Sequence, residues 1–136
     1  MALESEIREW IRNAQAEYNR YSRIVDDCNK KIDRLKPVYK ALGDIKKNFN
    51  NERRSTVNAI QEQSSWRGEK NTDFQEHGSE LDDICSSYYN RLDMAQDTVN
   101  RKIGELEAKK LELIPIMGRI WGQIERWWVE IQNITN

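Results

Sequence analysis

The feature of this sequence that most restricts its fold is a row of apolar residues spaced three and four positions apart. Such spacing places every member on one side of an α-helix, which turns once in about 3.6 residues. Beyond residue 42 the row is less regular as Lys, Asn and Arg accumulate, and we expect the helix to cover residues 4–64. The regular part consists of Ile11, Ala14, Tyr18, Tyr21, Val25, Cys28, Ile32, Leu35, Tyr39 and Leu42.

A second row of the same kind occupies the other half of the chain and predicts a helix over residues 71–134. Asn71 or Thr72 would cap its beginning. The only segment between the rows that is typical of a turn is 65–70. With just 6 Gly and 2 Pro, the chain lacks the turns of a β-fold. The second row contains Tyr89, Leu92, Gln96, Val99, Ile103, Leu106, Lys110, Leu113, Met117, Ile120, Ile124, Trp127, Ile131 and Ile134.

These rows predict an all-α fold, in which residues 1–136 form a single helical domain built as a long antiparallel two-helix hairpin of the coiled-coil type. Pro37 and Pro115 lie inside the predicted helices, where a proline removes one backbone hydrogen bond. Both fall at the outermost heptad position if Leu35 and Leu113 face the seam between the helices. The prolines therefore kink the helices away from the seam, or they break them into four segments.

Charge is distributed unevenly along the chain. Residues 30–54 hold nine basic and three acidic residues, a net +6, whereas residues 69–97 hold two basic and eight acidic residues, a net −6. A hairpin folded about residue 67 places position n opposite roughly position 134 minus n, so the basic stretch faces much of the acidic one. Because the basic stretch has this internal counterpart and few interleaved aromatics, we expect no nucleic-acid binding.

The residues that usually carry chemistry are scarce. One His and two Cys are too few for the usual four-ligand zinc site, so neither a metal nor another cofactor is predicted. His77 has no nucleophile or carboxylate at a recognisable catalytic spacing, and we expect a protein that is not an enzyme. Cys28 and Cys85 would lie about 30 Å apart along the hairpin, too far for a disulfide.

The predicted turn carries the most specific motif. Trp66 and Gly68 stand one residue apart, and a glycine there permits the positive φ that redirects a helix, while the indole covers the open end of the hairpin or a partner. An ordinary turn with an aromatic plug is the alternative. Phe74 follows the glycine by six residues, and the apolar row then continues through Leu81, Tyr88, Leu92, Ile103 and Leu106.

With these residues the chain resembles the WXG superfamily of small helical hairpins associated with type VII secretion. Over about residues 64–110 it is similar to the longer WXG-like companion proteins encoded beside LXG-domain toxins in Gram-positive bacteria. The resemblance implies a chaperone or adaptor that binds the helical LXG domain of a toxin. A homodimeric secreted WXG-type protein or a coiled-coil scaffold is the alternative.

Export is the point at which the sequence departs from this pattern. WXG-type substrates usually carry a Tyr-x-x-x-Asp signal beyond the second helix, whereas here that spacing occurs at Tyr89 and Asp93, inside it. Tyr89 is then expected to be an ordinary seam residue, with Tyr89 and Asp93 as a weak match to the export motif. The start of the sequence lacks the features of a signal peptide and no segment is apolar enough to cross a membrane. We therefore expect a cytoplasmic protein without membrane insertion, or one that is co-secreted with its partner.

The C-terminal quarter contains more apolar residues than one helix pair can bury. Ile114, Trp121 and Trp128 recur every seven residues beside the main row, which also contains Trp127. Trp10 is placed near residue 124 by the hairpin register and could cover part of them. The remainder requires a fold-back at Pro115 or a second protein. We therefore predict a partner-binding surface formed by Trp10, Ile114, Trp121, Trp127 and Trp128, and a dimer or heterocomplex that completes a four-helix bundle.

Overall fold

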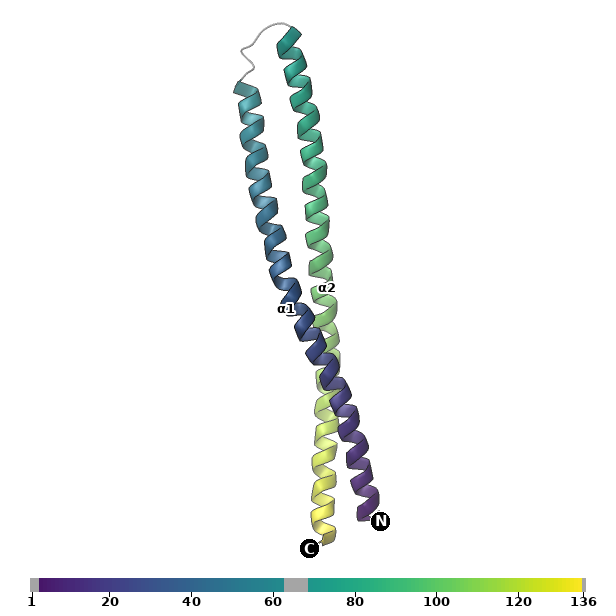
Figure 1. Cartoon of the computed structure of the whole chain (residues 1–136). Helices are drawn as coiled ribbons and strands as arrows, with labels where there is room; N and C mark the ends of the chain where they lie inside the picture. The colour runs from purple at the N-terminus through teal and green to yellow at the C-terminus, as the bar shows by residue number, and fades with distance from the viewer. Residues whose placement is uncertain (1–2, 63–68, 136) are drawn as a thin grey trace. The chain divides into compact units, whose positions relative to one another are not determined.

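Two long α-helices make up the part of the chain that the computed structural model describes, residues 3–62 and 69–135. Helix α1 extends over Glu4–Glu62 and α2 over Glu69–Thr135 (Figure 1), with no strand in these ranges. The all-α helical hairpin predicted from the apolar rows is confirmed. Helix α2 begins earlier than the predicted residue 71, so the prediction that Asn71 or Thr72 caps it is wrong. Trp66 and Gly68 lie outside the described residues.

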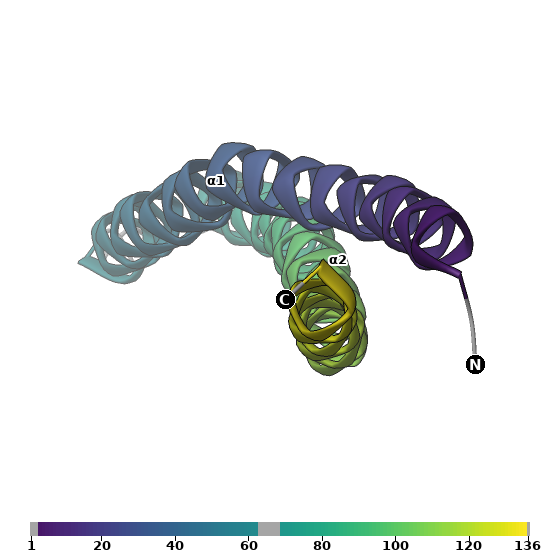
Figure 2. The same cartoon turned by 90° about the horizontal axis from the view of Figure 1, so that it is seen from below.

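The chain divides into two compact units. Unit 1 combines Met1–Arg34 with Ile103–Asn136, and unit 2 consists of Leu35–Lys102. Each unit therefore pairs one segment of α1 with one segment of α2. The beginning of α1 and the end of α2 both belong to unit 1 and lie at its same end (Figures 1 and 2), as an antiparallel hairpin requires.

Unit 1 contains the hydrophobic core. Its centre is formed by Ile7 and Ile11 of α1 and Ile124 and Ile131 of α2. Ala14, Ile120 and Trp127 pack against them. These residues come from the two apolar rows, which confirms that the rows face each other. All the residues that are buried within the described ranges belong to unit 1, namely Ile7, Ile11, Cys28, Ile32, Ile103, Leu106, Leu113, Ile124 and Ile131.

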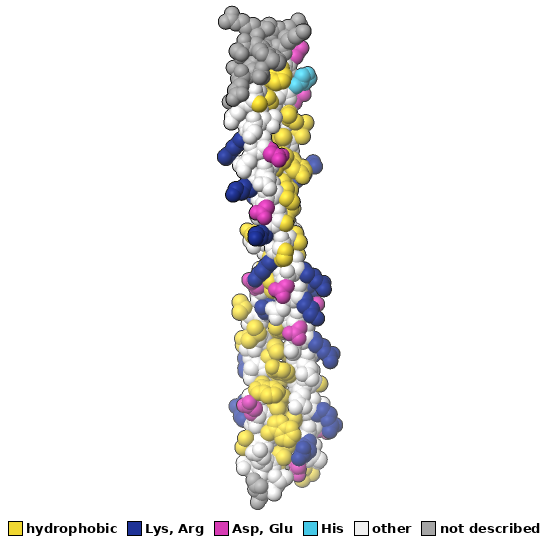
Figure 3. Space-filling model, turned by 60° about the vertical axis from the view of Figure 1, so that its left-hand side comes forward, with side chains coloured by type: hydrophobic (Ala, Val, Ile, Leu, Met, Phe, Trp, Pro, Cys, Tyr) yellow, Lys and Arg dark blue, Asp and Glu magenta, His cyan; other side chains and the backbone are white. Residues whose placement is uncertain are grey.

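Unit 2 is packed less closely, since none of its described residues is buried. Its helices are in close contact at Gly78, where an added Cβ would lie 2.9 Å from Cδ1 of Ile60. The rings of Phe49 and Tyr88 meet at a centroid distance of 4.8 Å. A band of hydrophobic side chains remains visible along one side of this unit (Figure 3), so its two helices alone leave much of their apolar surface in water.

Both prolines lie inside continuous helices, Pro37 in α1 and Pro115 in α2. The alternative in which they break the chain into four helical segments is therefore wrong. Both side chains are exposed, on the outer side of their helices. The backbone carbonyl that each proline leaves without a helical donor can then bind water, which reduces the cost of an interior proline.

The register of the hairpin differs from the predicted one. The sequence predicts that the numbers of facing residues add up to about 134, whereas the observed pairs add up to between 135 and 139. Facing positions on α2 are thus one to five residues later than expected, because side-chain contacts rather than the midpoint of the sequence set the register. The pairs are Trp10 with Trp127, Tyr18 with Trp121, Lys46 with Asp93, Phe49 with Tyr88, and Arg53 with Asp82.

Candidate partner-binding surface

Trp10 and Trp127 form an aromatic pair beside the core of unit 1. Their ring centroids are 5.8 Å apart and the planes are tilted by 48°, a geometry that favours aromatic pairs. Trp127 packs against the core, whereas Trp10 is exposed over 41% of its surface. A shallow depression beside the two rings is lined by Asn13, Ala14 and Glu17. This pair supplies one aromatic surface of unit 1.

Trp121 and Trp128 flank the buried isoleucines of α2 on the other side from Trp127, because helical periodicity separates neighbouring positions by about 100°. The Trp121 ring lies 5.5 Å from that of Tyr18, and the guanidinium of Arg8 lies 5.7 Å from the Trp128 ring. Both tryptophans remain exposed, over 48% and 40% of their surface. The contacts from α1 therefore hold the rings in place without covering them.

The indole of Trp121 is also fixed in orientation. Its Nε1–H donates a hydrogen bond of 2.8 Å to Oε1 of Glu125, one helical turn further along α2. Ile114, seven residues before Trp121, is exposed over 49% of its surface. Ile114, Trp121 and Trp128 thus form an apolar row that the described chain leaves half covered, as the sequence predicts. We call it the tryptophan row.

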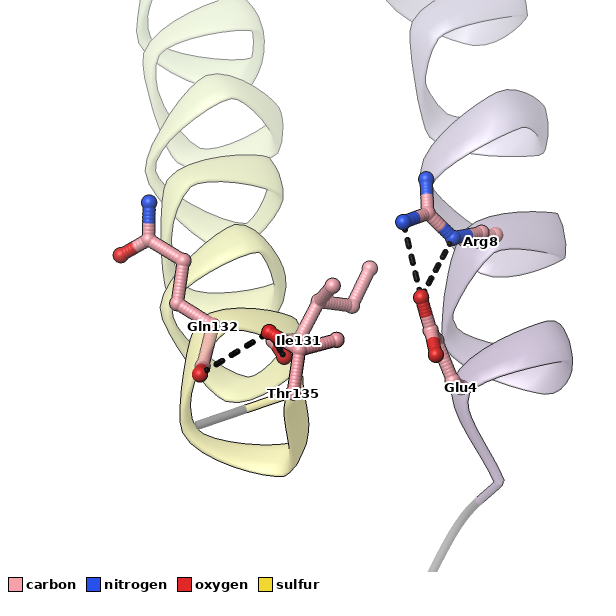
Figure 4. A network of polar contacts seen from close by, with 5 residues as sticks. All are labelled: Glu4, Arg8, Ile131, Gln132 and Thr135. Atoms are coloured by element: carbon pink, nitrogen blue, oxygen red, sulfur yellow. Dashed lines mark hydrogen bonds and ion pairs between the residues drawn. The ribbon is translucent and has the colours of Figure 1, made fainter.

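Arg8 of α1 is held over the Trp128 ring by Glu4, which lies one turn earlier on α1. Its Nε and Nη2 both donate to Oε1 of Glu4, at 3.0 and 2.8 Å (Figure 4). At the end of α2 the hydroxyl of Thr135 donates to the carbonyl oxygens of Ile131 and Gln132, at 3.1 and 3.2 Å. The contribution of Arg8 was not predicted, since spacing on one helix does not reveal the charged residues of its neighbour.

The sequence places Trp10 near residue 124, where it covers part of the wide apolar stripe of α2, and its ring meets Trp127 of that stripe. Tyr18 and Arg8 are the residues that contact Trp121 and Trp128. The five predicted interface residues consequently form two surfaces, on the two sides of the core.

Polar contacts across the seam hold unit 2 together. Nζ of Lys46 lies 2.5 Å from Oδ1 of Asp93 and 3.1 Å from Oε1 of Gln96. Nε of Arg53 donates to Oδ1 of Asp82 at 2.7 Å. The hydrogen bond from Arg53 lowers the pKa of Asp82, and that to Asp93 raises the pKa of Lys46. These contacts confirm that the basic stretch of α1 faces the acidic stretch of α2.

Tyr89 and Asp93 are brought together by the same lysine. Nζ of Lys46 lies 5.3 Å from the centre of the Tyr89 ring and forms the ion pair with Asp93. Both residues thus make contacts across the seam, which the position of Tyr89 in the apolar row predicts. Phe74, the described member of the predicted turn motif, is half-buried.

The described residues do not form a metal site, a membrane span or a disulfide. Within residues 3–62 and 69–135, no three His, Cys, Asp or Glu side chains come close enough to hold a metal ion. Neither helix, over the same ranges, has a stretch long and apolar enough to span a bilayer. Cys28 and Cys85 are both free thiols. The tryptophan row and its surroundings are therefore the strongest candidate for a functional surface in unit 1.

No family model, curated protein or solved structure matches this chain.

Proposed function

We propose that this protein is a non-enzymatic adaptor or chaperone, and that it binds a helical segment of another protein through the tryptophan row of unit 1. The observation that carries the proposal is the exposure of Ile114, Trp121 and Trp128 beside the buried residues of α2 in unit 1. Large aromatic residues that are held rigidly but left open to solvent are typical of the centres of protein interfaces.

The helical nature of the partner follows from the shape of this surface. The row runs straight along α2 with a repeat of seven residues, and an amphipathic helix presents its own apolar residues at the same repeat. A partner that lies along the hairpin would bury the row in a four-helix bundle if it contributes two helices. A globular partner with a flat surface would cover only part of it.

The resemblance to WXG-like companion proteins supports a specific partner class. We propose the helical LXG domain of a type VII secretion toxin, which the protein would bind in the cytoplasm and accompany to the secretion machine. The Tyr89–Asp93 spacing does not serve as the export signal in this proposal, because both residues contact Lys46 within the hairpin. The export signal would then be supplied by the partner.

The experiment replaces Trp121 and Trp128 with Gln and measures binding to a co-expressed LXG domain by titration calorimetry. A fully covered tryptophan buries about 150–250 Å², so covering the exposed half of each ring removes roughly 100 Å² from water. At about 25 cal/mol per Å² the two rings supply about 5 kcal/mol before ordering costs. We therefore expect the dissociation constant to rise at least about a hundredfold.

Leu111→Gln is the matched control, because Leu111 lies on the same helix and is exposed but outside the tryptophan row. It should leave the affinity unchanged. If the tryptophan variant binds as tightly as the original protein but melts at a much lower temperature, the row is part of the fold rather than an interface. The proposal would then be wrong.

A further inference from the structure

The paired rings of Trp10 and Trp127 form a surface of unit 1 that the proposed function does not use. They lie on the other side of the buried isoleucines from the tryptophan row, with their planes tilted by 48° and their centroids 5.8 Å apart. A depression of about 490 Å³ lies against both rings. Trp10 is exposed over 41% of its surface, so a ligand in this depression can reach the face of an indole ring.

A carboxylate borders the same depression. Glu17 lines it from α1, seven residues after Trp10, together with Asn13 and Ala14. Oε1 of Glu17 accepts a hydrogen bond of 3.3 Å from the hydroxyl of Tyr21, which carries no charge near neutral pH. Within residues 3–62 and 69–135, no ion pair is formed by Glu17. Its negative charge is therefore not neutralised by a neighbouring side chain.

No internal cation covers the two rings in the part of the chain that the structure describes. Arg20 is the basic residue one turn after Glu17, and its guanidinium lies 5.0 Å from the centre of the Tyr21 ring instead. The depression beside Trp10 and Trp127 thus combines aromatic faces with a negative charge, and it lacks the positive charge that would complete this combination.

The other exposed tryptophans of unit 1 do not offer the same combination. The guanidinium of Arg8 already lies 5.7 Å from the centre of the Trp128 ring. Glu125 accepts the hydrogen bond from Nε1–H of Trp121, so its carboxylate lies at the edge of that ring rather than over its face. Among the exposed tryptophans of the described ranges, Trp10 is therefore the one with an open face beside an unneutralised carboxylate.

We propose that the depression beside Trp10 and Trp127 binds an organic cation, a positively charged nitrogen that carries methyl or methylene groups. The face of an indole ring attracts such a cation when it lies within about 6 Å of the ring centre. Glu17 supplies the opposite charge at the border of the depression, and Ala14 offers the alkyl groups an apolar contact. The trimethylammonium group of a small molecule and the ammonium group of a protein lysine share this chemistry.

Ligands of other kinds fit the depression less well. Hard metal ions such as Ca²⁺ take about six to eight oxygen ligands, whereas Asn13 and Glu17 are the polar residues of the lining. An anionic ligand would be repelled by the carboxylate of Glu17. A neutral apolar ligand would leave this charge unpaired and partly remove it from water, which is unfavourable.

A titration with choline, observed by nuclear magnetic resonance, tests the proposal. The full chain is labelled with ¹⁵N, each indole N–H signal is assigned by replacing one tryptophan at a time with phenylalanine, and the ionic strength is held constant with NaCl. The signals of Trp10 and Trp127 should shift with a dissociation constant in about the millimolar range, because single cation–π contacts and exposed charge pairs are weak. The signal of Trp128 should not shift, since Arg8 already lies over its ring.

Two comparisons separate charge recognition from apolar binding. The uncharged molecule 3,3-dimethyl-1-butanol has the shape of choline, and it should bind at least about tenfold more weakly. Glu17→Gln changes an exposed side chain and should raise the dissociation constant for choline about threefold or more. Glu112→Gln is the matched control, because it removes the same charge about 22 Å along α2 from Trp127 and should have no effect.

The source of the cation is decided by a second titration with Nα-acetyl-lysine amide. Tighter binding of choline assigns the depression to a small quaternary ammonium compound, and tighter binding of the lysine derivative assigns it to a lysine of another protein. Three results would overturn the proposal: equal binding of choline and 3,3-dimethyl-1-butanol, no shift of the Trp10 and Trp127 signals in about 100 mM choline, or a shift at Trp121 in their place.

This outcome can be distinguished from that of the proposed function, because the tryptophan row lies on the other side of the core. Trp121→Gln with Trp128→Gln should weaken partner binding and leave choline binding unchanged. Glu17→Gln should weaken choline binding and leave partner binding unchanged. Loss of choline binding in the variant of the tryptophan row alone would place the cation there and refute the assignment to Trp10 and Trp127.

Discussion

Truncation of Ile124 to Ala is expected to be one of the most destabilising single changes in this protein. Ile124 is exposed over only 1% of its surface and contacts the other isoleucines at the centre of unit 1. Removing three buried carbon atoms costs about 2.4 kcal/mol at roughly 0.8 kcal/mol each. The cavity left behind adds to this, though a two-helix core open at its sides can partly close, so we expect about 3 kcal/mol in total.

Thermal unfolding followed by circular dichroism measures this loss. For a chain of this size, 1 kcal/mol corresponds to about 2–4 °C, so the melting temperature should fall by roughly 6–12 °C. Leu111→Ala is the matched control, since Leu111 lies on the same helix and is exposed over 72% of its surface. It should change stability by less than about 0.5 kcal/mol. Equal effects of the two changes would show that unit 1 does not hold the core of the protein.

Two further predictions concern particular contacts. Gly118→Ala, at a helical position with no other atom within 4 Å of the added Cβ, should stabilise the protein by about 1 kcal/mol, whereas Gly78→Ala should give less than half of that gain because Ile60 must move. Urea unfolding of both variants measures the difference. The pKa of Asp82 is lowered from 3.8 by its hydrogen bond to Arg53, so their contact stabilises the fold above about pH 4 and is lost as the pH falls through the lowered pKa. The melting temperature of Asp82→Asn should therefore approach that of the original protein in acid, and a constant difference between the two down to about pH 2 would contradict this assignment.

Much of the fold can be predicted from the apolar rows alone. Residues such as Ile11, Ile32, Ile103 and Ile124 fall on these rows and are buried where the helices meet. The spacing also locates the exposed row of Ile114, Trp121 and Trp128, since a stripe wider than one seam cannot be covered by a single neighbouring helix. Local periodicity suffices for these predictions because it depends only on helix geometry.

The sequence by itself determined the helices, the side of each that faces its neighbour, and the attraction between the basic and acidic stretches. It did not determine the register, because a shift of a few residues along an antiparallel seam still places apolar residues opposite apolar ones. Only the tertiary structure decided that Trp10 meets Trp127 and that Tyr18 and Arg8 meet the tryptophan row. The tertiary structure also shows that the buried residues of the described chain all lie in unit 1. The sequence could not predict this, because burial depends on how closely the two helices approach each other.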